Sequence, residues 1–327
     1  MKKILITGGL GFIGLHLSDQ LAANPNNTIV LVDNLIRGSL DDDAKKVISM
    51  PNVTFYQGDL TEKDFVFSLG GGFDDVYHFA AIIGVTNVIE NPDRVLSVNA
   101  VSTINLLEWA SLGNCENFLF SSTSEAYAWT FQKYEEIIPT PESIPLAITD
   151  LKNPRASYAG SKIFGELCAM AFGQKFSTKI SVVRYHNIYG PRMGYDHVIP
   201  QIFKRLKYNQ ENPLTVYSPN HSRAFCYVTD AVRATIEVQV SKNTQNEVVN
   251  IGNDTEEVKI IELAELIANI CGLSETALIG KDAKNDPVKR RCPDISKLKA
   301  LTGTTPNIPL DTGLRRTLEW YAKNLKS

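Results

Sequence analysis

The 327-residue sequence has neither the positive charge of a nucleic-acid-binding protein nor the long apolar runs of a membrane protein. Its 33 Lys and Arg residues against 36 Asp and Glu give a formal net charge of -3, which leaves no basic footprint for nucleic acid. No apolar run approaches the roughly 20 residues that cross a bilayer. The first residues pass directly into a predicted strand, without the layout of a signal peptide. We therefore expect a cytoplasmic globular protein with neither a nucleic-acid nor a membrane partner.

Cysteine and histidine are both scarce, with five of each. The cysteines form no CxxC pair, the histidines are scattered, and neither set has the spacing of a metal site. The sequence therefore predicts no metal and no disulfide framework, and the thiols are expected to be reduced. With 43% hydrophobic residues, the chain can bury the core of one large domain or two.

The sequence does contain a glycine-rich turn at its start. Residues 2–6 form an apolar strand pattern, residues 12–23 form a helical pattern, and Gly8, Gly11 and Gly14 follow a GxxGxxG spacing between and within them. In this context Gly8 permits a tight turn, Gly11 lets a pyrophosphate approach the backbone, and Gly14 lets the helix pack closely on the sheet. The free amides of the helix N-terminus then face the phosphates. The residues that carry these amides include Phe12 and Ile13.

An acidic residue completes this dinucleotide-binding pattern. Residues 27–32 are a second apolar strand, and Asp33 ends it. A carboxylate there accepts both ribose hydroxyls of NAD and repels the extra phosphate of NADP, so NAD is the predicted cofactor. Arg37 lies nearby and argues in the opposite direction. Asp59, which ends a third strand, is placed either to reach the adenine or to serve as an ordinary turn residue.

The alternation of strands and helices predicts the fold class. It continues through about residue 185 and argues for an α/β fold with a Rossmann-type, doubly wound parallel sheet. The small residues Ala80 and Ala81 would let a cofactor pass over the end of the fourth strand. After Tyr185 the pattern changes, which indicates a smaller C-terminal α/β lobe with a ligand cleft between the two parts. The predicted division is 1–185 with 223–251 returning to it, and 186–222 with 252–327.

Tyr158 and Lys162 are the first candidates for catalysis. They are four residues apart at the start of a predicted helix, so they share one face. An ammonium group beside a phenol lowers its pKa and makes it a usable base near neutral pH. Thr123, in the hydroxyl-rich end of the fifth strand, is placed to bind the same substrate hydroxyl. The alternative is a surface Tyr and Lys on a polar helix end.

Many motifs in order resemble the extended short-chain dehydrogenase/reductases that act on nucleotide sugars. The resemblance runs from Lys2 to about Leu318. It rests on TGGLGFIG, Asp33, Asp59-Leu60, HFAA, Asn99, SSTSEAY, SYAGSK and RYHNIYGPR.

This resemblance implies a tightly held NAD, a sugar-nucleotide substrate with UDP favoured, and a homodimer formed by two helices of each subunit. It implies catalysis by Thr123, Tyr158 and Lys162. It adds Asn34, Leu60, Asn99 and Tyr185 to the cofactor contacts. It places the nucleotide and diphosphate at Asn187, Val198, Tyr217, Arg223 and Arg291, and paired arginines suit a diphosphate.

The reaction implied by the family begins with oxidation at carbon 4 of the sugar, which gives a 4-keto intermediate. The following step depends on Ser124 and Glu125. Family 4,6-dehydratases show Thr-Asp-Glu here, and serine is too weak an acid to replace that Asp. Thr-Ser-Glu resembles the UDP-glucuronate decarboxylases, in which carbon dioxide leaves. A 4-epimerase needs neither group, and Glu125 as a structural or helix-capping carboxylate is the alternative to a catalytic role.

Two further features resemble the decarboxylases. Arg155 precedes Tyr158 by three residues and is placed to hold a uronate carboxylate, and NDPVKRRCPDISKLK is similar to their nucleotide-binding signature. Ala128 after Tyr127, the composition of 129–150, the segment AAIIGVTNV and His186 in place of a common Phe depart from the pattern. We expect decarboxylation of a UDP-hexuronate, with a 4-epimerase or a 4,6-dehydratase as alternatives. A non-catalytic NAD-binding scaffold and an NADPH-dependent ketosugar reductase are more distant ones.

Overall fold

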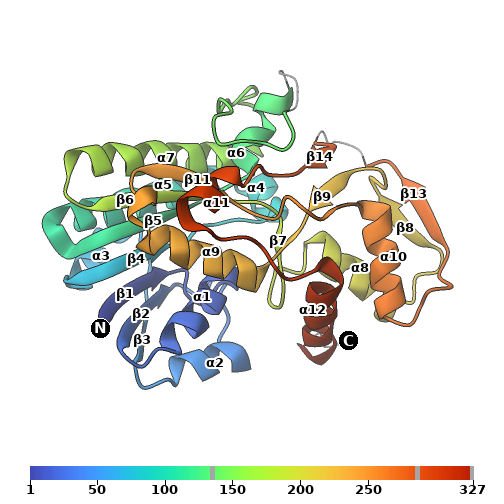
Figure 1. Cartoon of the computed structure of the whole chain (residues 1–327), viewed down its shortest axis with the longest axis horizontal. Coiled ribbons are helices and arrows are strands. Elements are labelled where there is room, and N and C mark those ends of the chain that lie inside the picture. The colour runs from blue at the N-terminus through green and yellow to red at the C-terminus, as the bar shows by residue number, and fades with distance from the viewer. Residues whose placement is uncertain (133–136, 284–287, 325–327) are drawn as a thin grey trace.

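A seven-stranded parallel sheet forms the centre of the protein (Figure 1). The computed structural model describes residues 1–132, 137–283 and 288–324. The strand order is β11-β6-β5-β4-β1-β2-β3, so the order reverses between β1 and β4, where doubly wound sheets bind ligands. The predicted fold class is confirmed. The strands are β1 (Lys2–Thr7), β2 (Asn27–Asp33), β3 (Val53–Gln57), β4 (Phe73–His78), β5 (Cys115–Thr123), β6 (Lys179–Tyr185) and β11 (Glu247–Ile251).

Helices cover both faces of this sheet (Figure 1). Successive strand residues point to opposite faces, so Ile4 and Ile6 of β1 join one apolar cluster and Leu5 joins the other. The first cluster packs under α1 (Phe12–Ala22), α2 (Asp42–Ile48) and α9 (Val228–Val240). The second packs under α3 (Lys63–Ser68), α5 (Pro92–Trp109) and α7 (Ala156–Lys175).

The C-terminal part adds small sheets beside the central one. β7 (Ile188–Tyr189) pairs with β10 (Cys226–Tyr227), and β8 (Leu214–Tyr217) pairs with β13 (Leu278–Lys281). β9 (Ser222–Ala224) lies between β12 (Glu257–Lys259) and β14 (Arg290–Arg291). Four helices complete this part: α8 (Val198–Lys207), α10 (Ile260–Ile270), α11 (Ser296–Thr302) and α12 (Leu310–Asn324).

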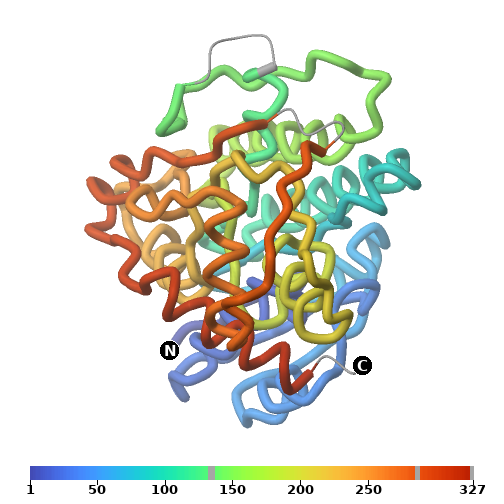
Figure 2. The backbone as a smooth tube through the Cα atoms, turned by 90° about the vertical axis from the view of Figure 1, so that its right-hand side faces the viewer, coloured from blue at the N-terminus to red at the C-terminus, as the bar shows by residue number. Residues whose placement is uncertain are grey.

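The chain between α10 and α11 links the two parts. In Figure 2 the orange chain that follows α10 rises from the C-terminal part toward the top of the view. There Thr140 N donates to Cys292 O at 2.9 Å, so the segment after β5 and the segment around β14 are joined. The short elements near this edge and elsewhere are α4 (Val85–Glu90), α6 (Glu125–Ala128), η1 (Ala110–Asn114), η2 (Thr130–Gln132) and η3 (Lys242–Thr244).

The bounds expected from the sequence agree with some elements and differ from others. Strands are expected over 53–57 and 179–185, and β3 and β6 have these bounds. The fourth and fifth strands are expected over 75–80 and 117–122, and β4 and β5 each begin two residues earlier. The single strand expected over 223–227 is two strands, because β9 pairs with β12 and β14 while β10 pairs with β7. The helix expected over 258–271 begins at Ile260, because the preceding residues form β12.

Part of the NDPVKRR signature and residue 325 of the helix expected over 313–325 lie outside the described residues.

Among the described helices, none is both long and apolar enough to cross a membrane. All five cysteines are free thiols.

Candidate active site

The glycine turn holds β1, α1 and the end of β4 in close contact. Gly8 has φ +67°, and a Cβ there would lie 2.7 Å from the backbone nitrogen of Ala80. A Cβ on Gly14 would lie 2.1 Å from the carbonyl oxygen of Gly8, so the close helix packing predicted from Gly14 is present. Gly11 is the residue before α1, which begins with Phe12 and Ile13. The turn is therefore a backbone cradle that a side chain would fill, and it fits a pyrophosphate.

Asp33 lies directly beside this turn. Its buried carboxylate accepts hydrogen bonds from the backbone amides of Leu10, at 3.1 Å, and Leu35, at 2.9 Å. Asn34 accepts from the Ile36 amide at 3.1 Å, which shapes the following turn. The carboxylate is thus fixed at the end of β2, where it suits the ribose of a dinucleotide.

Arg37 is directed across the site. Its Nη1 lies 3.3 Å from the place of a Cβ on Gly84, and its Nη2 lies 2.9 Å from that of a Cβ on Gly194. The Arg37 charge also acts to lower the pKa of Tyr158. The guanidinium therefore lies on the side of the site that contains Tyr158. This position does not support the NADP alternative that the sequence left open.

The other predicted cofactor residues have local partners. Asp59 accepts from the amide and hydroxyl of Thr61, at 2.9 and 2.8 Å, and Leu60 is buried. Asn99 accepts from the Ile82 amide at 2.7 Å and donates to the Ser161 hydroxyl at 3.1 Å, so its side chain ties the loop after β4 to α7. Ala80 and Ala81 are half-buried in that loop. The Tyr185 phenol hydrogen-bonds Thr235 at 2.7 Å inside the core.

Thr123, Tyr158 and Lys162 meet between the end of β5 and the first turns of α7. Lys162 is buried and its Nζ donates to the Ser121 carbonyl at 2.8 Å. Burial lowers the pKa of Lys162 to about 8. Burial also raises the pKa of Tyr158 to about 12, although a hydrogen bond with Thr123 and the charge of Arg37 act in the opposite direction. The prediction that Lys162 gives Tyr158 a low pKa is therefore wrong, because burial of the phenol outweighs its neighbours.

Glu125 begins α6 directly after Ser124 and pairs with an arginine from the far end of the chain. Its Oε1 lies 2.5 Å from Nη1 of Arg291. Burial acts to raise the pKa of Glu125, but Arg291, followed by Arg155 and Arg223, outweighs this effect and the pKa is lowered. An ionised carboxylate thus lies among three arginines.

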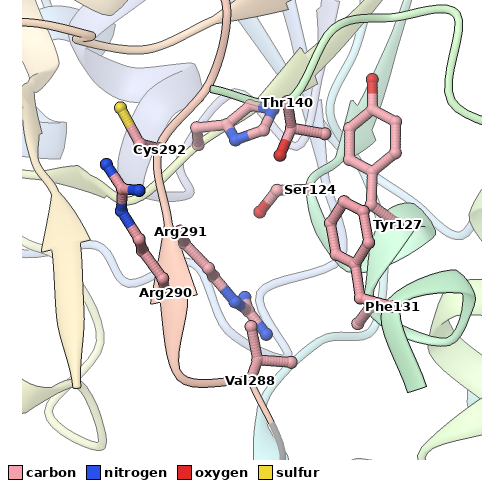
Figure 3. Close-up of a pocket in the computed structure, with 10 residues that line it drawn as sticks. Ser124, Tyr127, Phe131, Thr140, Val288, Arg290, Arg291 and Cys292 are labelled. Atoms are coloured by element: carbon pink, nitrogen blue, oxygen red, sulfur yellow. The ribbon is translucent and has the colours of Figure 1, made fainter. Parts of the chain in front are cut away.

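Arg223 and Arg291 lie side by side because β9 and β14 run parallel, with these two residues in register. Arg223 donates to the carbonyl oxygens of Ser222, at 2.8 Å, and Val288, at 2.9 Å. Arg290 points to the opposite side of β14 from Arg291 (Figure 3) and pairs with Glu257 at 2.7 Å. Arg291 is therefore the arginine of β14 that pairs with Glu125.

The remaining predicted substrate residues belong to the C-terminal part. Asn187 has φ +44° and donates to the Ala224 carbonyl at 3.1 Å. Val198 begins α8, and the exposed Tyr217 ends β8. The structure brings together Glu125, Arg155, Arg223 and Arg291, whereas Tyr217 lies on a different small sheet from β9 and β14.

A small pocket opens between α6 and β14 (Figure 3). In the view, Ser124 lies between the aromatic residues Tyr127 and Phe131 on one side and Arg291 on the other. Thr140 and His186 also line it. No three His, Cys, Asp or Glu side chains in the described ranges come together as a metal site.

Comparison with known proteins identifies the family. Residues 4–252 match the profile of the NAD dependent epimerase/dehydratase family. The chain belongs to this family. It is an NAD-dependent enzyme.

Two relatives and one solved structure illustrate this similarity. The chain is 32% identical to UDP-glucuronic acid decarboxylase 1 of Xenopus tropicalis, over 99% of this chain and 73% of that protein. It is 31% identical to UDP-N-acetyl-alpha-D-glucosaminuronate decarboxylase of Bacillus cytotoxicus, over 98% of each. The structure of UDP-glucuronic acid 4-epimerase from Bacillus cereus, with UDP-glucuronic acid and NAD, superposes with a TM-score of 0.86, 27% identity and coverage of 98% and 99%. The chain is therefore similar to enzymes that modify nucleotide sugars.

Sequence reasoning missed a buried polar network below the pocket. Arg184 forms a salt bridge of 2.6 Å with Glu166, and its Nη1 donates to the Tyr127 phenol at 2.7 Å. Asn250 accepts from Tyr127 at 3.0 Å and hydrogen-bonds His186 at 3.1 Å. The sequence signals were the arginine in an apolar strand and the histidine that departs from the family pattern.

Proposed function

We propose that the enzyme decarboxylates a UDP-hexuronate through a 4-keto sugar. The observation that carries this proposal is the ionised Glu125 held among Arg155, Arg223 and Arg291. The arginines suit the two anionic groups of such a substrate, the diphosphate and the uronate carboxylate. Ser124, which lines the pocket, supplies no carboxylic acid to expel water. The two decarboxylase relatives support the same conclusion.

Each side chain has a proposed role in this reaction. The glycine turn and Asp33 would hold NAD, which would supply the acceptor for the hydride of carbon 4. Tyr158 would take the proton of the carbon-4 hydroxyl as a phenolate, and Thr123 orients the phenol. Burial disfavours this charged form, so the positive charge of a bound nicotinamide ring would be needed to stabilise it. The resulting ketone is β to the carboxylate, so the bond between carbons 5 and 6 breaks and carbon dioxide leaves. Carbon 5 then gains a proton from a water molecule, and the ionised Glu125 is proposed to orient that water. Carbon 4 finally regains its hydride, and its oxygen regains the proton held by Tyr158. The overall change is the loss of carbon dioxide without net oxidation, which gives a UDP-pentose.

Incubation of the purified enzyme with UDP-glucuronate and NAD tests this proposal. Mass spectrometry of the nucleotide product is expected to show the loss of one carbon dioxide, and carbon 6 label is expected in released gas. A Glu125→Gln variant is expected to lose this activity. Glu116→Gln, which changes an exposed carboxylate on β5 in the same way, is its matched control and should leave the rate unchanged. Retention of carbon 6 in the nucleotide product would rule out decarboxylation.

A UDP-hexuronate 4-epimerase is the second candidate. The similarity to the Bacillus cereus UDP-glucuronic acid 4-epimerase favours it, and Thr123, Tyr158 and Lys162 would suffice for the oxidation it needs. This reaction leaves the mass unchanged and inverts carbon 4, so chromatography that separates the two epimers distinguishes it. A 4,6-dehydratase would instead remove water from a neutral UDP-hexose.

We further propose a division of labour in the chain and a homodimer. Residues 1–185 and 223–251 would hold NAD, while 186–222 and 252–327 would hold the nucleotide sugar. The α5–α7 pair leaves Leu96, Val101, Phe164 and Leu167 exposed, an apolar face that suits a two-fold helix bundle. Leu167→Glu should convert a dimer to a monomer in sedimentation. Five free thiols fit a cytoplasmic location.

A further inference from the structure

Asn250, on β11, fixes the direction of every hydrogen bond in the network beneath the pocket. Its Nδ2 donates to the carbonyl oxygens of Thr140, at 3.0 Å, and Asp294, at 3.2 Å. A carbonyl oxygen can only accept, so the amide nitrogen of Asn250 must lie on that side. The Oδ1 of Asn250 therefore faces the other way and needs donors.

Two side chains supply those donors, the Tyr127 phenol at 3.0 Å and Nε2 of His186 at 3.1 Å. The Tyr127 oxygen already accepts from Nη1 of Arg184 at 2.7 Å, so its single proton is directed to Asn250. By the same reasoning, Nε2 of His186 must carry its proton, because the oxygen it faces has none to give. The network thus sets the tautomer of His186.

The other ring nitrogen of His186 is consequently a hydrogen-bond acceptor. His186 is 2% exposed, and burial lowers its pKa to about 3, with Arg291 and Arg184 acting in the same direction and the Asn250 hydrogen bond against it. The imidazole is therefore neutral, and Nδ1 carries a lone pair. Within the described part of the chain, the His186 ring hydrogen-bonds Asn250 through Nε2, and Nδ1 remains able to accept a hydrogen bond. The residue lines the pocket with Ser124 and Arg291.

We propose that Nδ1 of His186 accepts a hydrogen bond from a hydroxyl group of the substrate's glycosyl unit, which makes His186 a specificity-determining residue. This inference rests on the proposed nucleotide-sugar function. A lone pair attracts a donor and repels a carboxylate, whereas Arg291, which also lines the pocket, attracts anions. We therefore expect the anionic groups of the substrate to face Arg291 and a hydroxyl group to face His186.

Binding measurements on His186→Phe and His186→Gln test this role. UDP lacks the sugar, so its Kd by calorimetry should stay within about twofold of wild type in both variants. UDP-glucuronate should bind about 10- to 100-fold more weakly to His186→Phe, because the phenyl ring offers no acceptor and leaves the hydroxyl unpaired. His186→Gln, whose amide has both a donor and an acceptor, should recover most of the loss.

Nuclear magnetic resonance of the wild-type protein with 15N-labelled histidine provides a test that needs no stable variant. The Nδ1 resonance of His186 should be that of an unprotonated nitrogen, and it should move on addition of UDP-glucuronate and stay fixed on addition of UDP. Equal UDP-glucuronate affinity of His186→Phe and wild type, or an Nδ1 resonance that ignores the sugar, would overturn the inference while leaving the proposed function intact. Failure of the wild type to bind UDP-glucuronate would overturn both.

Discussion

Glu125 and Arg291 are 166 positions apart in the chain, yet they form a 2.5 Å ion pair. This contact joins α6, which follows the central strand β5, to β14 of the C-terminal part. Glu125, which is proposed for the carbon-5 step, thus pairs with Arg291, which is proposed to bind the diphosphate. Occupation of Arg291 by substrate would therefore change the electrostatic environment of Glu125.

Replacement of Arg291 by Met should raise the pKa of Glu125. In the native protein Arg291 is the strongest influence that lowers this pKa, and burial, which raises it, would remain. If Glu125 works as a carboxylate, the acid limb of the kcat/KM profile should move to higher pH. Arg290→Met is the matched control, because Arg290 pairs with Glu257, and its acid limb should stay in place. An acid limb that Arg291→Met leaves unmoved would separate Glu125 from the pH dependence.

Glu125→Gln should separate oxidation from the later step. The amide keeps the size of the side chain but carries no charge and cannot take part in proton transfer, so turnover should fall by about 100- to 10,000-fold. The absorbance of reduced nicotinamide should still rise on addition of UDP-glucuronate, because Tyr158 and Lys162, which are proposed for the oxidation step, are unchanged. Normal turnover by this variant would assign Glu125 a structural role as the first residue of α6.

The parts of this site that lie close in sequence could be predicted from it. The spacing of Gly8 and Gly14 predicted a close turn, and the backbone distances confirm it. The position of Asp33 at a strand end followed from the apolar run before it. These features are predictable because a strand, a turn and a helix fix their own geometry within about 30 residues.

The electrostatics of the site were not predictable in the same way. Helical spacing put Tyr158 and Lys162 on one face, but the ammonium donates to Ser121 on the strand beneath, and burial decides the pKa of the phenol. Asn99 was expected at the cofactor, and its amide is used by Ile82 and Ser161. Burial and partners from distant segments depend on tertiary packing, which one sequence does not display.

Lys162→Met should remove a pH dependence of stability between about pH 8 and pH 10. Burial gives folded Lys162 a pKa of about 8 against an ordinary value of 10.5, so in this range the unfolded chain binds a proton that the folded chain lacks. The free energy of unfolding then rises with pH, by an amount on the order of 2–3 kcal/mol for this residue. Urea titrations at several pH values measure it as the difference between wild type and variant. The exposed Lys179→Met is the control, and a difference between wild type and Lys162→Met that is constant with pH would contradict the assignment.

Two glycine-to-alanine changes should shift stability in opposite directions. In Gly14→Ala the new Cβ would lie 2.1 Å from the Gly8 carbonyl oxygen and 3.2 Å from Gly9 Cα, so α1 must move away from the turn, at a cost of about 1–3 kcal/mol. Gly160 lies inside α7 with no heavy atom within 4 Å of its Cβ position, and alanine there should stabilise by about 0.5–1 kcal/mol. Urea denaturation measures both changes.

NAD affinity distinguishes the two variants further. Gly14→Ala displaces the helix N-terminus that faces the pyrophosphate, so its Kd for NAD by calorimetry should rise along with the loss of stability. In Gly160→Ala the glycine turn is untouched, and the NAD affinity should equal that of wild type. Native NAD affinity in Gly14→Ala would mean that the turn re-forms around the methyl group, and the close approach of α1 to Gly8 would then be a feature of packing alone.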